Sequence, residues 1–235
     1  MIKFSSFSLK SILGPVTLAC VLASCDNRET NTAAADAAET IALFDGETLS
    51  GWSHVLVDDS LKMEDVWSVK DGAIVCKGEP LGYLVTEDSF EDFKLTLEWR
   101  WAAEPTNSGV LLRIASEPIG FMPTCVEAQL MHESAGDIWA FRGAKVEGAE
   151  ERIKIIEDHE ELGDFKGVQK TKMAEKPAGE WNHYEIVVRG DSMKVKVNGE
   201  LVNEASGLDI VSGPIGLQSE GSEIHFRNIE VRSWL

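Results

Sequence analysis

Positive charge is scarce in this sequence. The chain carries 22 Lys and Arg against 40 Asp and Glu, which gives a formal net charge of −18 at pH 7. A surplus of this sign argues against binding nucleic acid or anionic lipid through bulk charge, and it favours neutral or cationic ligands. We therefore expect no nucleic-acid partner.

An apolar run long enough to anchor the chain permanently in a bilayer is also missing. The run at residues 12–23 follows two lysines and precedes the first acid, so residues 1–24 are predicted to be a secretory signal peptide. Residues 22–25, Leu-Ala-Ser-Cys, are similar to a bacterial lipoprotein box. This predicts that Cys25 is lipidated and that acyl chains hold the exported protein to a bacterial membrane. The alternative is a soluble exported protein with a chance cysteine.

The rest of the chain divides into a tether and one domain. Residues 25–40 combine polar residues and alanines without apolar periodicity, which predicts a flexible tether. Residues 41–235 suit one domain that buries a sizeable core. Only two cysteines lie in it, Cys76 and Cys125. In an oxidising compartment they either form a disulfide or remain two buried thiols.

A convincing helical period is absent as well, and the domain alternates as strands do. Residues 92–101, DFKLTLEWRW, place Phe, Leu and Trp side chains on one face, so Trp99 and Trp101 are expected in the core. Asn198-Gly199 predicts a tight hairpin turn. Short strands separated by Gly, Pro, Asn and Asp predict an all-β, antiparallel, two-sheet sandwich or jelly roll.

The charged stretch at residues 143–179 has weak patterning. It could contain one short helix, and Asp158-His159-Glu160 could be imagined as a metal site. No other His or Cys has matching spacing, so a solvated loop is the favoured interpretation.

Eight short motifs occur in order between residues 41 and 235. They are LFDGETLSGW, DFKLTLEWRW, NSGVLLR, VEAQL, GEWNHYEIVVRG, VNGELV, GPIGLQSEG and FRNIEVR. Together they closely resemble the 3-keto-disaccharide hydrolase domain family. The resemblance implies a concanavalin-like, two-sheet jelly roll, often carried by exported lipoproteins of glycan-degrading bacteria. This sequence has Glu220 where the family commonly has His.

Long polar side chains recur on the non-core faces of three strands. Glu127 and Gln129 share a face because side chains two apart on a strand point the same way. If residues 92–101, 108–114 and 125–131 are neighbouring strands, Glu98, Arg100 and Arg113 join them. The resemblance favours a sugar-binding groove here; the alternative is an exposed face of solvated ion pairs.

The substrate that the resemblance implies needs one base. A 3-keto group acidifies the C2 proton, so a base can form an enolate that expels the C1 substituent, and water then adds to the enone. Glu127 is the candidate base, Arg113 or Arg100 the partner of the enolate oxygen, and His132 the candidate acid. Gln129 would orient the substrate. No cofactor is certain, but a divalent cation could replace an Arg; the sequence does not decide the metal.

Four further residues are candidate substrate contacts. Trp139 is a candidate for stacking on a sugar. Asn107 opens a strand, and the alternative there is that Ser108 and Gly109 simply form the turn. Gln218 and Arg227 lie on late strands, and the alternative for Arg227 is to anchor a loop through backbone carbonyls. A phase shift after Phe226 predicts a bulge at Arg227-Asn228.

Three functions remain open at this point. The first is an enzyme that cleaves 3-keto glycosides or disaccharides, and the second is a non-catalytic carbohydrate-binding module. The third is a structural surface lipoprotein without a ligand, which the polar cluster at Glu98, Arg113 and Glu127 disfavours. An oligosaccharide or glycoside is thus the expected ligand.

Overall fold

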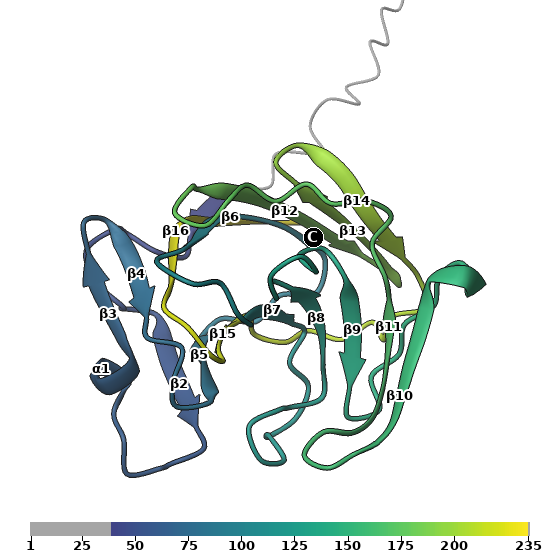
Figure 1. Cartoon of the computed structure of the whole chain (residues 1–235), viewed down its shortest axis with the longest axis horizontal. Helices are drawn as coiled ribbons and strands as arrows, with labels where there is room; N and C mark the ends of the chain where they lie inside the picture. The colour runs from purple at the N-terminus through teal and green to yellow at the C-terminus, as the bar shows by residue number, and fades with distance from the viewer. Residues whose placement is uncertain (1–38, 235) are drawn as a thin grey trace, which may run out of the picture. The chain divides into compact units, whose positions relative to one another are not determined.

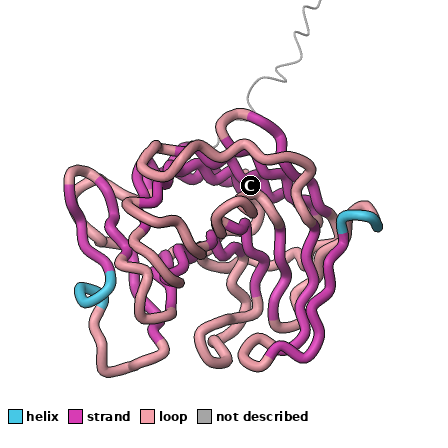
Figure 2. Tube along the Cα trace, viewed as in Figure 1, coloured by secondary structure: helices cyan, strands magenta, loops and turns pink. Residues whose placement is uncertain are grey.

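The computed structural model describes residues 39–234, and this part is almost entirely β-structure. It contains sixteen strands, the four-residue helix α1 (Met63–Val66) and the single-turn helix η1 (Glu150–Arg152) (Figure 2). Neither helix has the length or apolarity to cross a membrane. The all-β prediction is confirmed. The predicted signal peptide and Cys25 lie outside the described residues.

The strands form two antiparallel sheets, here called sheet A and sheet B (Figure 1). Sheet A has the spatial order β14 (Glu200–Ala205), β13 (Ser192–Val197), β12 (Asn182–Arg189), β6 (Phe93–Trp101), β16 (Ile224–Ser233), β4 (Ala73–Cys76) and β3 (Trp67–Lys70), with β1 (Thr40–Ala42) also paired to β16. Sheet B has the order β10 (Ile153–His159), β11 (Gly163–Val168), β9 (Ile138–Phe141), β8 (Cys125–Gln129), β7 (Gly109–Leu112), β15 (Gly216–Ser219), β5 (Gly82–Thr86) and β2 (Trp52–Leu56). The predicted two-sheet jelly-roll architecture is confirmed.

The core contains side chains from both sheets. On β6, every second side chain is buried, among them Leu97, Trp99 and Trp101, so the predicted packing role of the two tryptophans is confirmed. Val126 and Ala128 of β8 belong to the same apolar cluster. Because alternate residues of a strand point to opposite faces, this placement directs Glu127 and Gln129 away from the core.

Two local predictions are confirmed. Asn198 and Gly199 connect β13 to β14 with φ angles of 52° and 84°, as a tight hairpin turn of the primed type requires. The pairing of β16 with β6 shifts register between Arg227 and Glu230, where Asn228 has a φ of 51°. This is the predicted bulge.

The predicted neighbourhood of three strands is wrong in one respect. β7 and β8 are paired in sheet B, but β6 lies in sheet A, between β12 and β16. Cys76 and Cys125 also lie in different sheets, and both are buried free thiols rather than a disulfide.

Residues 143–179 were expected to form a solvated loop, but they contain the β10–β11 hairpin. The apolar side chains of β10 are poorly buried, and Ile155 is 59% exposed. Strands of this kind show no alternation between buried and exposed positions, because neither face lies in the core. Backbone pairing of β11 with β9 places the hairpin at the edge of sheet B.

Candidate active site

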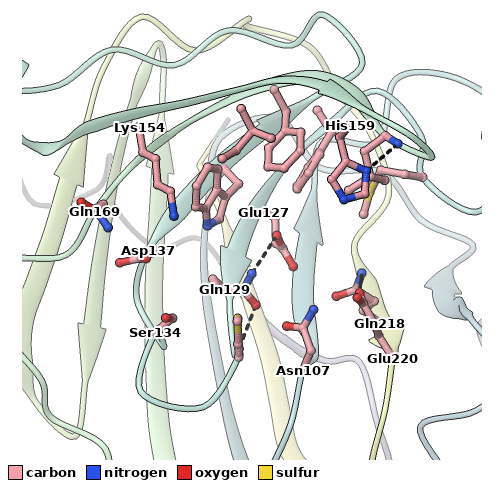
Figure 3. A pocket seen from close by; sticks show the side chains of 17 residues that line it. Asn107, Glu127, Gln129, Ser134, Asp137, Lys154, His159, Gln169, Gln218 and Glu220 are labelled. Atoms are coloured by element: carbon pink, nitrogen blue, oxygen red, sulfur yellow. Dashed lines mark hydrogen bonds between the residues drawn. The ribbon is translucent and has the colours of Figure 1, made fainter.

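A cavity of about 350 Å³ opens on the face of sheet B that points away from the core. Strands β8, β9, β10, β11 and β15 and their loops supply its walls (Figure 3). All five residues of β8 are buried, although the strand alternates between apolar and polar residues. One face of β8 packs in the core and the other forms the floor of the cavity, and this accounts for its burial on both faces.

Glu127 is the most deeply buried acid of the cavity, with 1% of its surface exposed. Its carboxylate lies against Gly109 of the neighbouring strand β7: a Cβ atom at residue 109 would be 1.8 Å from Glu127 Oε1. Gln129 Oε1 accepts the backbone N–H groups of Leu130 and Met131 at 2.9 and 2.8 Å, which directs its Nε2 toward Glu127 Oε2 at 3.5 Å. The carboxyl group of Glu127 is therefore positioned by its contact with Gly109 and by the oriented amide of Gln129.

Burial raises the pKa of Glu127 well above its ordinary value, and the charges of Glu220 and Asp137 raise it further. Glu220 itself lines the cavity, and burial raises its pKa as well. Its anion is stabilised by the side chains of Asn107 and Gln218; Gln218 Nε2 donates to Glu220 Oε2 at 2.7 Å. Two carboxyl groups with raised pKa values in one cavity suit proton transfer in either direction.

The β10–β11 hairpin adds two basic groups to the cavity wall. His159 Nδ1 accepts the backbone N–H groups of Leu162 and Glu161 at 3.2 and 3.3 Å. The proton of the neutral imidazole therefore resides on Nε2, which can donate to a ligand. Lys154 Nζ lies 5.8 Å from the ring centroid of Trp139.

Five of the residues selected from the sequence line this cavity. They are Asn107, Glu127, Gln129, Trp139 and Gln218. Figure 3 shows Asn107, Gln129 and Gln218 on the same side of the cavity as Glu127. The structure thus brings together the polar pair of β8 and three of the candidate contacts.

The two other residues predicted to be catalytic lie outside the cavity. Arg113 follows β7 with a φ of 50°, which ends the alternation of that strand, and its guanidinium donates to the carbonyl oxygens of Glu91, Gly190 and Asp209 at 2.8 Å each. His132 is not among the residues of the wall and pairs instead with Glu175, with 3.7 Å between Nδ1 and Oε2. The predicted juxtaposition of both residues with Glu127 is wrong.

Glu98, Arg100 and Arg227 lie together on sheet A. Arg227 Nε donates to Glu98 Oε2 at 2.6 Å, and the Arg227 guanidinium carbon stacks 3.9 Å from the ring centroid of Trp181. The Arg100 guanidinium carbon lies 4.7 Å from the same ring. Their predicted contact with the ligand of Glu127 is wrong, because strands β6 and β16, which carry them, belong to the other sheet.

Sequence reasoning missed several groups of the wall. His159 was assigned to a solvated loop, and Glu220 was noted only as a departure from a family motif. Asp137 and Lys154 carried no signal, because Asp137 lies in the connection directly before β9 and Lys154 lies on an edge strand without alternation. The fold-back of the β10–β11 hairpin brings His159 and Lys154 to the cavity of Glu127.

The cavity presents oxygen atoms that are suited to bind a cation or a sugar. Asn107 Oδ1 and Gln218 Oε1 are buried and accept no hydrogen bond from residues 39–234. Together with the carboxylates of Glu127 and Glu220, they are donors that hard divalent cations prefer, and they suit sugar hydroxyls equally well. Within the described part of the chain, no group of three or more His, Cys, Asp or Glu is arranged to hold a metal ion.

The raised pKa of Glu127 predicts that stability depends on pH. The folded state holds this proton above pH 4.5, the ordinary pKa, whereas the unfolded state releases it. Stability therefore falls as pH rises from about 4.5 towards the folded pKa. Glu127→Gln removes this contribution, so the melting temperature of the variant should exceed that of the wild type most at about pH 8 and least near pH 4.5. A variant that is less stable than the wild type at pH 8 would contradict this prediction.

Comparisons with known proteins agree with the fold and define the family. A 3-keto-disaccharide hydrolase from Bacteroides thetaiotaomicron is 22% identical over 247 residues, which cover 84% of this chain and 79% of that protein. A crystal structure of a candidate glycosyl hydrolase from Parabacteroides distasonis is 24% identical, with a TM-score of 0.58 over 83% of this chain and 99% of the other.

A carbohydrate-binding module from Bacillus subtilis shares the same architecture. It is 13% identical, with a TM-score of 0.54 over 78% of this chain and 96% of the module. At such identities the solved structures establish the fold alone. A family model described as a 3-keto-alpha-glucoside-1,2-lyase-like domain matches residues 39–232. The chain belongs to the family of 3-keto-alpha-glucoside-1,2-lyase-like domains, with a carbohydrate-related hydrolase or binding function.

Proposed function

We propose that this chain cleaves 3-keto glycosides by elimination across C1 and C2, followed by hydration. The observation that carries the proposal is the buried carboxyl of Glu127, which has a raised pKa and faces a cavity that also holds Glu220. A carboxylate whose pKa is raised above the ordinary value is a stronger proton acceptor, which suits the weakly acidic C2 proton of a ketone. The family description and the activity of the Bacteroides relative support the same chemistry.

In the proposed elimination, Glu127 takes the C2 proton while the C1–oxygen bond breaks. The two carboxyl groups raise each other's pKa, so with Glu127 ionised its charge favours the protonated form of Glu220, which gives a proton to the departing oxygen. The charge that develops on the C3 oxygen is stabilised by hydrogen-bond donors of the wall, for which Gln129 Nε2 and His159 Nε2 are available. One proton has then moved to Glu127 and one has left Glu220.

Hydration restores both carboxyl groups. Water adds to C1 of the enone and gives a proton to Glu220, while Glu127, whose carboxyl proton exchanges with the solvent between the two steps, protonates C2. The sum of the two steps is hydrolysis of the glycoside with no net change in the protein. The unpartnered oxygens of Asn107 and Gln218 are acceptors for the sugar hydroxyls or for the water.

The test compares a 3-keto glucoside with its unoxidised parent in heavy water. The keto compound should be cleaved and the parent should not, because only the ketone acidifies C2. The released 3-keto glucose should carry deuterium at C2, observed by NMR, when the product is analysed before slow solvent exchange. Binding of both compounds without cleavage would instead favour a carbohydrate-binding module. Cleavage without deuterium would favour direct displacement at C1.

A further inference from the structure

The cavity has two chemically different halves. The carboxyl and amide side chains of Asn107, Glu127, Gln129, Gln218 and Glu220 lie on one side, and apolar side chains occupy the other, beneath the β10–β11 hairpin that carries Lys154 and His159 (Figure 3). The apolar half consists of Met122, Trp139, Phe141, Ile156, Leu162 and Phe165. Apart from Ile156, Leu162 and Phe165, which are partly exposed, these side chains are at most 9% exposed.

The aromatic rings of this half hold one another in place. Phe165 lies 4.9 Å from Phe141 and 5.4 Å from Trp139 between ring centroids, and the second pair meets edge to face. The ring of Trp139 rests on the bare backbone of Gly167, where a Cβ atom would lie 2.4 Å from Cε3. The apolar half is thus a preformed slot, whose rings need little reorganisation to accept a ligand.

A second sugar would fit this half poorly. Its hydroxyl groups would lose water and meet aromatic and aliphatic side chains, and a buried hydroxyl without a hydrogen-bond partner weakens binding. The cavity of about 350 Å³ is within the range of small-ligand pockets, about 300–1,000 Å³. One sugar ring on the polar side and one apolar ring in the slot would match its two surfaces.

We propose that the apolar half is a subsite for an aromatic aglycone, so that the preferred substrates are 3-keto glycosides of aromatic alcohols and phenols rather than 3-keto disaccharides. This rests on the proposed function, because it places the bond to be cleaved between the two halves. The C1 oxygen would then lie at the boundary between the slot and the carboxyl groups. His159, whose ring lies 5.8 Å from Phe165 edge to face, borders the slot and offers Nε2–H to a substituent on the aglycone.

The experiment uses the wild-type protein and unoxidised glucosides, which bind without reacting. The dissociation constants of benzyl glucoside, methyl glucoside and a glucose disaccharide are measured by calorimetry for both anomers. The benzyl compound should bind roughly 10–100-fold more tightly than the methyl compound, since burying one aromatic ring contributes about 1.5–3 kcal/mol. The disaccharide should bind no better than the methyl glucoside. Equal affinities for benzyl and methyl, or tightest binding of the disaccharide, would overturn the proposal.

Two variants locate the effect. Phe165→Ala should remove most of the benzyl preference and leave methyl glucoside binding unchanged, and Phe165→Leu should do so partially if the alanine variant does not fold. Ile155→Ala, on the same hairpin but outside the cavity and 59% exposed, is the matched control and should keep the preference. A preference that survives both changes at Phe165 would place the aglycone elsewhere and refute the subsite.

Turnover separates this proposal from the proposed function. Benzyl and methyl 3-keto glucosides have leaving groups of similar basicity, so a difference in kcat/KM reports binding of the aglycone. Cleavage of both at equal kcat/KM would refute the aromatic subsite and leave the proposed function standing. A benzyl preference in binding without any cleavage would retain the subsite and refute the enzyme.

Discussion

Glu127→Gln is expected to lower kcat on a 3-keto glucoside by roughly 10²–10⁴, the contribution of a positioned proton acceptor. The amide keeps the shape of the side chain and its contact with Gly109, but it cannot accept the C2 proton. The dissociation constant should change far less than kcat, because no binding group is removed. Wild-type enzyme should also react more slowly with substrate deuterated at C2 when proton removal limits the rate.

The leaving group distinguishes Glu127 from Glu220 in this experiment. Glu220→Gln should impair turnover of a methyl 3-keto glucoside, whose leaving oxygen needs a proton, yet spare a p-nitrophenyl 3-keto glucoside, whose leaving oxygen does not. Glu127→Gln should impair both substrates. The opposite pattern would exchange the two roles, and near-normal kcat in both variants would show that neither carboxyl transfers the proton.

Loss of turnover in Glu127→Gln is expected together with a gain in stability at neutral pH. A buried carboxylate without a cationic partner opposes folding, and its pKa is raised for that reason. Functional groups often conflict with stability in this way. A variant that loses activity because it unfolds would show the reverse, so the melting temperature identifies the cause of the loss.

The sequence was informative wherever a side chain's direction followed from strand alternation. Val126 and Ala128 on one face of β8 required Glu127 and Gln129 to lie on the other, and the structure has them lining the cavity. The same rule failed for Arg113. A positive φ of 50° at this residue ends the alternation. No pattern in a single sequence predicts that an arginine after a strand has a left-handed backbone conformation.

Alternation also cannot tell which strands share a sheet. Glu98 and Arg100 lie on the predicted face of β6, but the connection at residues 102–108 crosses from sheet A to sheet B, so β6 and β7 are not neighbours. The prediction for His159 was wrong for a different reason. Its strand is at an edge of sheet B and buries neither face in the core, so the sequence there has the character of a loop although backbone hydrogen bonds hold it in a hairpin.

Arg113→Met is expected to destabilise the fold by about 3–5 kcal/mol, the usual cost of removing one partner from a buried ionic network. The guanidinium, whose side chain is 2% exposed, donates to three carbonyl oxygens and pairs with Asp92 at 3.1 Å. Methionine fills a similar volume but leaves these acceptors without a donor in the interior. In a domain of this size, each kcal/mol lowers the melting temperature by about 2–4 °C.

The catalytic rate distinguishes this structural role from a catalytic one. Arg113 does not line the cavity of Glu127. The kcat of the folded Arg113→Met variant at low temperature should therefore stay within about twofold of the wild type. Loss of a residue that stabilises the oxyanion would instead lower kcat by about 10²–10³. Arg113→Lys keeps the charge but fewer of the hydrogen bonds and should be intermediate in stability, which provides a folded variant if the methionine protein unfolds. Arg189→Met, at an exposed arginine 5.6 Å from the ring of Trp234, is the matched control and should change the free energy of unfolding by about 0.5 kcal/mol or less. A folded Arg113 variant with unchanged stability and a hundredfold lower kcat would show that Arg113 has a catalytic role and not a structural one.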